Sequence, residues 1–181
     1  MSDPYNGKKQ QRVMASLIAH DAQKAIDFYK EVFDASVSFV AKYNNKIAHS
    51  EITIGNTVLM VSDEIYGEFA KSARTIGDSP VTFYYYVDNV DSVFNKAIQH
   101  GAIQMFPVHN EFYGDRIGSI IDPFGFKWTI ATHVKDVNQS EMQTGLQNMM
   151  ANATQTGGAD DLMYKKYIKY KSKYLSKRQQ I

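Results

Sequence analysis

Residues Phe112–His133 read FYGDRIGSIIDPFGFKWTIATH, and this stretch decides the fold of the chain. The side chains over Arg116–Ile121 alternate with the period of a half-buried strand. The next four residues, Asp122-Pro123-Phe124-Gly125, have the pattern of a type I turn, with Asp first, Pro second and Gly fourth. Phe126–Thr132 is rich in aromatic and β-branched residues, which favour strands. The sequence therefore predicts a β-hairpin here.

The hairpin closes the second of two copies of one pattern, in which a strand and a helix are followed by three strands. The first copy is expected to hold a helix capped by Asp21 and strands at Arg12–Ala19, Ala35–Tyr43, Ile47–Ile54 and Thr57–Val61. The second copy is expected to hold a strand at Val81–Val87, a helix from Val90 to Gly101, a strand at Ile103–Val108 and the hairpin. A short helix and a loop are predicted between the copies, over Glu64–Ser79. Such a repeat indicates an α+β protein of two βαβββ modules, each burying a sheet face against the other.

Three segments of the chain resemble the vicinal-oxygen-chelate (VOC) superfamily of glyoxalases, bleomycin resistance proteins and dioxygenases, and more narrowly its PhnB-like branch. They are IAHDAQKAIDFYKEVFDA at 18–35, AHSEITIGNTVLMVSDE at 48–64 and GDRIGSIIDPFGFKWTIATH at 114–133. The resemblance implies a glyoxalase-like domain over 12–133, with modules at 12–62 and 80–133 whose curled mixed sheets enclose a cavity. Because PhnB-like proteins often dimerise, it also implies a homodimer.

Composition limits the classes of protein that this chain can belong to. It has 181 residues, 44% of them hydrophobic, a net charge of +1 and no cysteine. Disulfides, thiolate zinc sites and cysteine nucleophiles are therefore excluded. No apolar run reaches membrane-spanning length, and the polar stretch 1–11, expected to be a flexible N-terminus, lacks the apolar core of a signal peptide. We expect an intracellular, cytoplasmic protein without a membrane partner.

The C-terminal part has a different character from the repeats. Residues 134–153 predict an accessory helix, and 154–181 predict a linker and a basic tail. Lysine and tyrosine alternate in the tail segment KKYIKYKSKYL, which resembles the tails of giant-DNA-virus proteins and implies host cytoplasm or a virion. The lysines could make weak contacts with nucleic acid or another anionic surface. The alternative is a solvated or self-associating helix.

The VOC resemblance also points to positions where a metal would lie. Metalloenzymes of the superfamily hold a divalent ion with His, Glu or Gln side chains from the first and fourth strands of each module. By register, those positions fall near Met14, Met60, Thr82 and Thr129. Thioether sulfur is soft and a neutral hydroxyl carries no charge, so neither suits such an ion. We therefore expect no metal and no cofactor, and no glyoxalase or dioxygenase chemistry that needs the ion.

A ligand cavity is the alternative to a metal centre. Its expected lining residues are Met14, Met60, Thr82, Tyr84, Tyr86, Arg116, Trp128 and Thr129. Tyr84, Tyr86, Tyr113 and Trp128 could stack on a planar ligand, or could be core residues. Arg116 could bind a carboxylate or phosphonate, or could pair with a carboxylate and hold the hairpin.

His49 with Glu51 and His109 with Glu111 are two further pairs of candidate residues. Residues two apart on a strand point to the same face, so each pair could ligate a metal or act as an acid–base couple. The alternative is that both pairs lie on solvated strand faces. The leading hypothesis is a metal-free small-molecule-binding protein. The other two are a glyoxalase-type lyase or isomerase with a relocated site at His49 and Glu51, and a dimeric scaffold.

Overall fold

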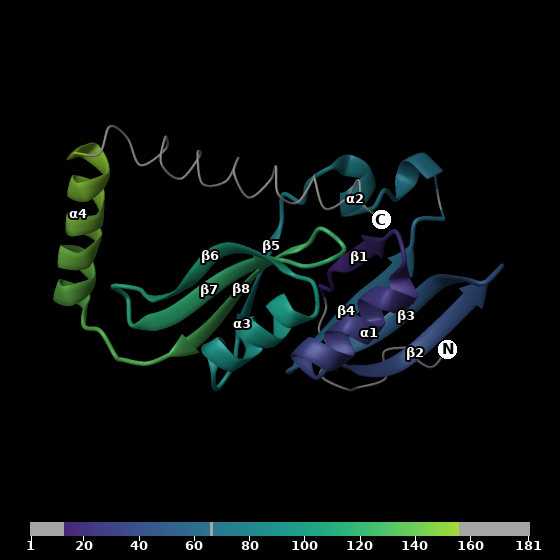
Figure 1. Cartoon of the computed structure of the whole chain (residues 1–181), viewed down its shortest axis with the longest axis horizontal. Helices are drawn as coiled ribbons and strands as arrows, with labels where there is room; N and C mark the ends of the chain where they lie inside the picture. The colour runs from purple at the N-terminus through teal and green to yellow at the C-terminus, as the bar shows by residue number, and fades with distance from the viewer. Residues whose placement is uncertain (1–12, 66, 156–181) are drawn as a thin grey trace, which may run out of the picture. The chain divides into compact units, whose positions relative to one another are not determined.

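The computed structural model describes residues 13–65 and 67–155. They form two compact units that divide between Ser79 and Pro80, and each unit holds a four-stranded mixed sheet (Figure 1). The strand order is β1-β4-β3-β2 in the first sheet and β5-β8-β7-β6 in the second, and neither sheet closes into a barrel. The prediction of an α+β fold with two βαβββ modules and a C-terminal helix is confirmed.

The first unit follows the predicted element order. Its elements are β1 (Ser16–Ala19), α1 (Ala22–Phe33), β2 (Ser36–Tyr43), β3 (Lys46–Ile54), β4 (Thr57–Asp63), the 3-10 turn η1 (Gly67–Phe69) and α2 (Ala73–Ile76). Strands β2, β3 and β4 pair antiparallel, while β1 runs parallel to β4. The last two helical elements fill the segment that was expected to be a short helix and a loop.

Helix α1 covers one face of the first sheet. Its N-cap Asp21 accepts a hydrogen bond from the Lys24 backbone amide at 3.0 Å. Its apolar side chains recur at helical spacing and are buried together, as the sequence predicts: Ala22, Ala25, Ile26, Tyr29, Val32 and Phe33. Alternate strand residues such as Leu17, Ile52 and Val61 are buried with them. This packing is the core of the first unit.

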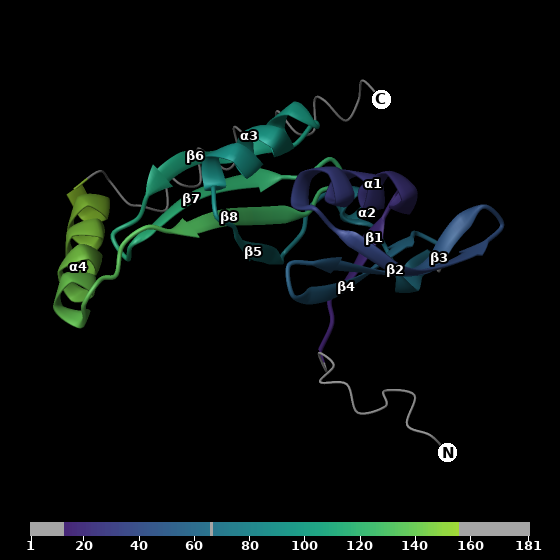
Figure 2. The ribbon, with the colours of Figure 1, turned by 90° about the horizontal axis from the view of Figure 1, so that it is seen from below.

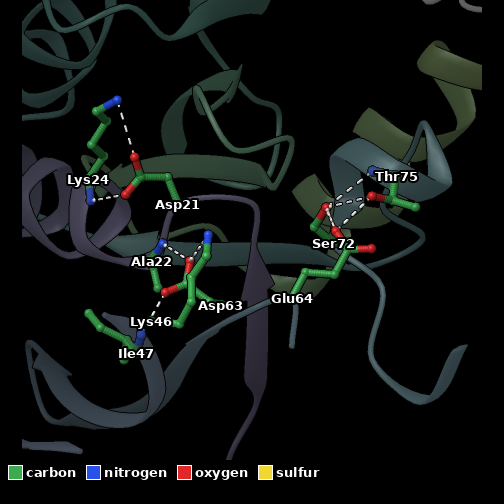
Figure 3. Close-up of polar contacts among 9 residues, drawn as sticks. All are labelled: Asp21, Ala22, Lys24, Lys46, Ile47, Asp63, Glu64, Ser72 and Thr75. Atoms are coloured by element: carbon green, nitrogen blue, oxygen red, sulfur yellow. Dashed lines mark hydrogen bonds and ion pairs between the residues drawn. The ribbon is translucent and has the colours of Figure 1, made fainter. Parts of the chain in front are cut away.

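A buried carboxylate joins the elements of the first unit. Asp63, which is 4% exposed, accepts hydrogen bonds from the backbone amides of Ala22 at 3.0 Å and Ile47 at 2.7 Å. The end of β4 is thereby tied to the start of α1 and the start of β3 (Figure 3). Next along the chain, Glu64 accepts hydrogen bonds from the hydroxyls of Ser72 and Thr75, both at 2.7 Å. This second carboxylate fixes the start of α2.

The second unit repeats the pattern and adds a helix. Its elements are β5 (Thr82–Tyr86), α3 (Val90–Gln99), β6 (Ile103–Asn110), β7 (Asp115–Ile121), β8 (Lys127–His133) and α4 (Gln139–Gln155). Helix α3 covers one face of the sheet (Figure 2), and a Cβ added to Gly118 would lie 2.7 Å from the Phe94 ring. The position is therefore restricted to glycine by the close approach of helix and strand.

The predicted hairpin is β7 and β8, and Asp122 organises its turn. The Asp122 side chain is fully buried. Its Oδ1 accepts hydrogen bonds from the backbone amides of Phe124 and Phe126, both at 2.9 Å, and its Oδ2 accepts one from Trp128 Nε1 at 3.0 Å. Gly125 adopts a φ of 97°, which other residues rarely adopt. The turn thus fixes the register of the two strands.

Several boundaries differ from the prediction. Strand β1 begins at Ser16 and not at Arg12, and β5 is shorter than Val81–Val87 by one residue at each end. Helix α4 begins at Gln139, where Asn138 accepts hydrogen bonds from the amides of Ser140 and Glu141. None of the helices in the described ranges is long and apolar enough to cross a membrane. The predicted N-terminal segment 1–11 and the basic tail lie outside the described residues.

Candidate functional site

Each sheet has a face that its own helix, α1 or α3, does not cover, which we call the helix-free face. On the first sheet, Met60 lies in register with Glu51 on β3 and with Ser16 on β1, so these side chains share that face. His49 lies two residues from Glu51, with its Nε2 3.6 Å from Glu51 Oε1. Met14, in the segment before β1, is half-buried.

The pair of His49 and Glu51 is only partly shielded from solvent. Their side chains are 39% and 38% exposed, and the Phe39 ring lies 5.9 Å from the imidazole. An exposed pair at this distance is a weak interaction. Among the residues that the structure describes, no group of three His, Cys, Asp or Glu side chains could hold a metal ion.

A cavity of about 410 Å³ lies at the β2–β3 hairpin of the first unit. It is lined by Tyr43, Asn44, Lys46, Ala48 and Ile65. None of the predicted site residues lines it, and its apolar walls offer a single cationic side chain. We therefore assign the cavity no chemistry.

Three tyrosines gather at the helix-free face of the second sheet. Tyr84 and Tyr86 point to the same side of β5, and their ring centroids lie 5.3 Å apart with the planes tilted by 41°. Tyr113, from the turn before β7, brings its hydroxyl to 3.3 Å from that of Tyr84. Tyr84 and Tyr86 are 47% and 59% exposed, so their rings are accessible. The sequence allowed two interpretations of these tyrosines and Trp128, as an aromatic pocket or as core residues.

A buried carboxylate lies beneath the tyrosines. Asp115, 4% exposed, accepts a hydrogen bond from the Tyr86 hydroxyl at 2.7 Å and lies 2.9 Å from His133 Nδ1. The other imidazole nitrogen of His133 lies 3.0 Å from an Asp136 oxygen. Asp115 begins β7 and His133 ends β8, and the antiparallel register places them opposite each other. We call Tyr84, Tyr86, Tyr113, Asp115 and His133 the tyrosine site.

The electrostatics of the tyrosine site keep its hydroxyls protonated. The hydrogen bond to Asp115 raises the pKa of Tyr86 to about 12. Burial, together with the hydrogen bond to Tyr113, raises the pKa of Tyr84 well above its usual range. The hydrogen bonds of His133 to Asp115 and Asp136 raise its pKa above 6.5. At neutral pH the tyrosines therefore present neutral hydroxyls and intact ring faces.

Two of the predicted positions lie beside the tyrosines. Thr129 is in register with Tyr84 on β5 and with Ser119 on β7, and its hydroxyl is buried 3.0 Å from that of Ser119. Thr82 is exposed on the same face of β5 as Tyr84, in register with Lys127. The structure thus brings Thr82, Thr129 and the tyrosines to one face.

Trp128 and Arg116 lie on the other face of the sheet from the tyrosines, because neighbouring residues of a strand point to opposite faces. Trp128 is 3% exposed and stacks on Phe83 with ring centroids 4.7 Å apart. Arg116 binds both carboxylate oxygens of Asp91 on α3, at 2.7 and 2.8 Å. The expected grouping of these two residues with the ligand cavity is therefore corrected: both serve the helix-covered side of the sheet.

The second His–Glu pair makes short local contacts. His109 Nε2 lies 2.9 Å from Glu111 Oε1, and its Nδ1 lies 2.9 Å from the Pro107 carbonyl oxygen. These contacts raise the pKa of His109, chiefly through the carbonyl of Pro107. The imidazole is oriented by its own strand, which favours a structural role.

The fold defines the class of protein: two βαβββ modules, each with a four-stranded sheet that one helix covers on one face. The family model of the Glyoxalase/Bleomycin resistance protein/Dioxygenase superfamily matches residues 10–130. The chain belongs to this superfamily.

The chain is also similar to a bacterial relative and to two solved structures. An uncharacterized protein of Mycobacterium bovis is 32% identical over 134 residues, covering 72% of this chain and 88% of the relative. The PhnB protein of Bacillus cereus is 18% identical with a TM-score of 0.55, covering 67% of this chain and 99% of that structure. TioX of Micromonospora sp. ML1 is 20% identical with a TM-score of 0.55, covering 69% and 100%. The two structures show the fold alone.

The comparisons do not support the viral setting that the basic tail implied. The mycobacterial relative is bacterial, and the family match ends at residue 130, before the tail begins. The resemblance of the tail to viral proteins therefore gives no information about the origin of this chain.

The superfamily's divalent metal does not fit the residues at the expected positions. Met14 and Met60 offer thioethers, and Thr82 and Thr129 offer neutral hydroxyls. The Thr129 hydroxyl is already hydrogen-bonded to Ser119. Hard and borderline divalent ions favour carboxylate and imidazole donors, which these four positions lack.

Proposed function

We propose that this chain is a PhnB-like small-molecule-binding protein that binds its ligand at the tyrosine site without the superfamily metal. One observation carries the proposal. Three tyrosines share the helix-free face with a buried carboxylate that fixes one of them, while the positions for metal ligands carry thioethers and hydroxyls.

The chemistry of the tyrosine site suits reversible binding. Tyrosine rings stack on planar groups, and their hydroxyls donate and accept hydrogen bonds at the edge of such a group. Asp115 holds the Tyr86 hydroxyl in place before any ligand arrives. A side chain that is already oriented loses less conformational entropy on binding.

Two alternatives have weaker support. A glyoxalase-type lyase or isomerase would need a third ligand beside His49 and Glu51, and the described residues supply no such group. A dimeric scaffold is favoured by β2, an edge strand whose apolar residues Val37, Phe39 and Val40 are exposed. Dimerisation is compatible with ligand binding, so we retain a homodimer as part of the proposal, to be checked by light scattering.

The proposal is tested by ligand binding in the absence of metal. Chelator-treated protein, shown to be metal-free by elemental mass spectrometry, is screened against a library of planar small molecules by saturation-transfer NMR. We expect ligands whose signals disappear in Tyr84→Leu and Tyr86→Leu but persist in Tyr43→Leu, the matched control on the first unit. Ligands that need an added divalent ion, or that depend on Tyr43 alone, would overturn the proposal.

A further inference from the structure

Three carboxylates lie in or beside the tyrosine site. The Asp115 carboxylate is buried and accepts a hydrogen bond from Tyr86. Burial is the largest cause of the raised pKa of Tyr113, and the negative charges of Glu111 and Asp115 also raise it. Asp136 adds a third carboxylate through His133. At a pH where the imidazoles are neutral, the site carries an uncompensated negative potential.

The nearby cationic side chains do not cancel this potential. Arg116 is held by Asp91 on the helix-covered side of the sheet. Lys135 pairs with Glu141 at 3.1 Å. Lys127 lies on the same face as the tyrosines but in register with Thr82, at the opposite end of β5 from Tyr86. His133 and His109 contact Asp115 and Glu111, and their pKa values are raised, so the carboxylates dominate at Tyr86 and Tyr113 at a pH above those raised pKa values.

We propose that the tyrosine site takes an organic cation, a quaternary or protonated amine carried on an apolar or aromatic group. This inference rests on the proposed function and names its ligand class. A cation is attracted to the face of a tyrosine ring, and neighbouring carboxylates strengthen that attraction without touching the ligand. The accessible rings of Tyr84 and Tyr86 provide the faces, and Asp115 provides the charge.

The contacts of the site favour an organic cation over a metal ion or an anion. Both Asp115 oxygens already contact neighbours, Tyr86 and His133, so a metal ion would have to break those contacts. The raised pKa of Tyr86 keeps its hydroxyl neutral and disfavours a phenolate ligand. An anion would be repelled by the carboxylates, and Arg116 does not offset them because its guanidinium is bound by Asp91 on α3.

The test compares two probes of one shape. (3-Hydroxyphenyl)trimethylammonium and 3-tert-butylphenol differ only in whether nitrogen or carbon carries the three methyl groups. Titrations of the full chain, followed by NMR and calorimetry, should show the cation binding at least about tenfold more tightly than its neutral isostere. Tyr84→Leu and Tyr86→Leu should weaken binding of the cation, while Tyr43→Leu should leave it unchanged. Asp115→Asn should weaken binding of the cation more than binding of the isostere, because only the cation also loses the attraction of the carboxylate charge.

The outcomes separate this inference from the proposed function. If both probes bound with equal affinity and Tyr84→Leu weakened the binding of both, the preference for a cation would be refuted. The proposed binding site would still be supported. Tighter binding of the anionic 3-hydroxybenzenesulfonate than of the cation would also refute the preference for a cation and leave the binding site supported. NMR spectra would first show that each variant is folded. If none of the three probes then bound in a way that depends on the tyrosines, the inference that the ligand is an organic cation would be contradicted. If the library screen also gave no tyrosine-dependent ligand, the proposed function would fail as well.

Discussion

Replacement of Asp122 by alanine should be among the most damaging single changes in the second unit. The Asp122 carboxylate is fully buried and accepts hydrogen bonds from two backbone amides and from the indole of Trp128. Asp122→Ala removes the acceptor of all three and leaves the donors buried. Asp122→Asn keeps one oxygen for the two amides, but its NH2 group then faces the indole N–H.

The expected magnitudes follow from these contacts. A hydrogen bond to a charged group contributes about 1.5–3 kcal/mol, and the three bonds here share one side chain, so their effects do not add fully. We expect Asp122→Ala to lower the free energy of unfolding by about 3–5 kcal/mol. Asp122→Asn loses mainly the indole bond and should cost about 1.5–3 kcal/mol. Either value is a large part of the stability of a typical domain.

The assay is urea unfolding followed by tryptophan fluorescence. Trp128 is the sole tryptophan, so its emission reports the unit that holds Asp122. Asp88→Ala is the matched control, since Asp88 is an exposed residue of the same unit, and it should change stability by less than about 0.5 kcal/mol. A midpoint for Asp122→Ala equal to that of the control would refute the reasoning, as would an asparagine variant no more stable than the alanine variant.

Three further changes test other parts of the structure. Asp63→Ala removes the acceptor of two backbone amides and should cost about 2–4 kcal/mol in the unfolding free energy of the first unit, measured by circular dichroism in urea. Gly118→Ala brings a methyl group against Phe94 and should cost about 1–3 kcal/mol, seen as a lower Tm. Because Asp115 raises the pKa of His133 above its ordinary 6.5, the contribution of the charged imidazole is present below pH 6.5 and is lost as pH rises through the folded-state pKa. His133→Gln should remove this part of the pH dependence of stability, and an unchanged slope would contradict it.

Local patterns in the sequence were sufficient to predict the fold. The Asp122-Pro123-Phe124-Gly125 pattern predicted the turn because each residue suits one position of it, and the structure confirms the hairpin. The apolar face of α1 was predicted from spacing alone and is buried. The hydrogen bond from Trp128 to Asp122 was not predicted, since no local pattern links an indole to a carboxylate six residues away.

The tyrosine site was only partly predictable. Alternation along β5 placed Tyr84 and Tyr86 on one face, as the structure does. His133 was not among the predicted site residues, although counting outward from the turn places it opposite Asp115. The same count places Trp128 on the opposite face from Thr129, which corrects its grouping with the tyrosines. Side-chain partners depend on register across strands, whereas spacing along one strand reveals only a shared face.

The two modules repeat one fold, but their helix-free faces offer different chemistry. On the first sheet, His49 and Glu51 are partly exposed at a distance too long for a strong pair. On the second, Asp115 is buried and orients the Tyr86 hydroxyl before a ligand binds. A preorganised polar group beside accessible rings is the arrangement that gives selective binding, because little has to move. The family model assigns the chain to its superfamily, and the ligand site that we propose lies in the second module.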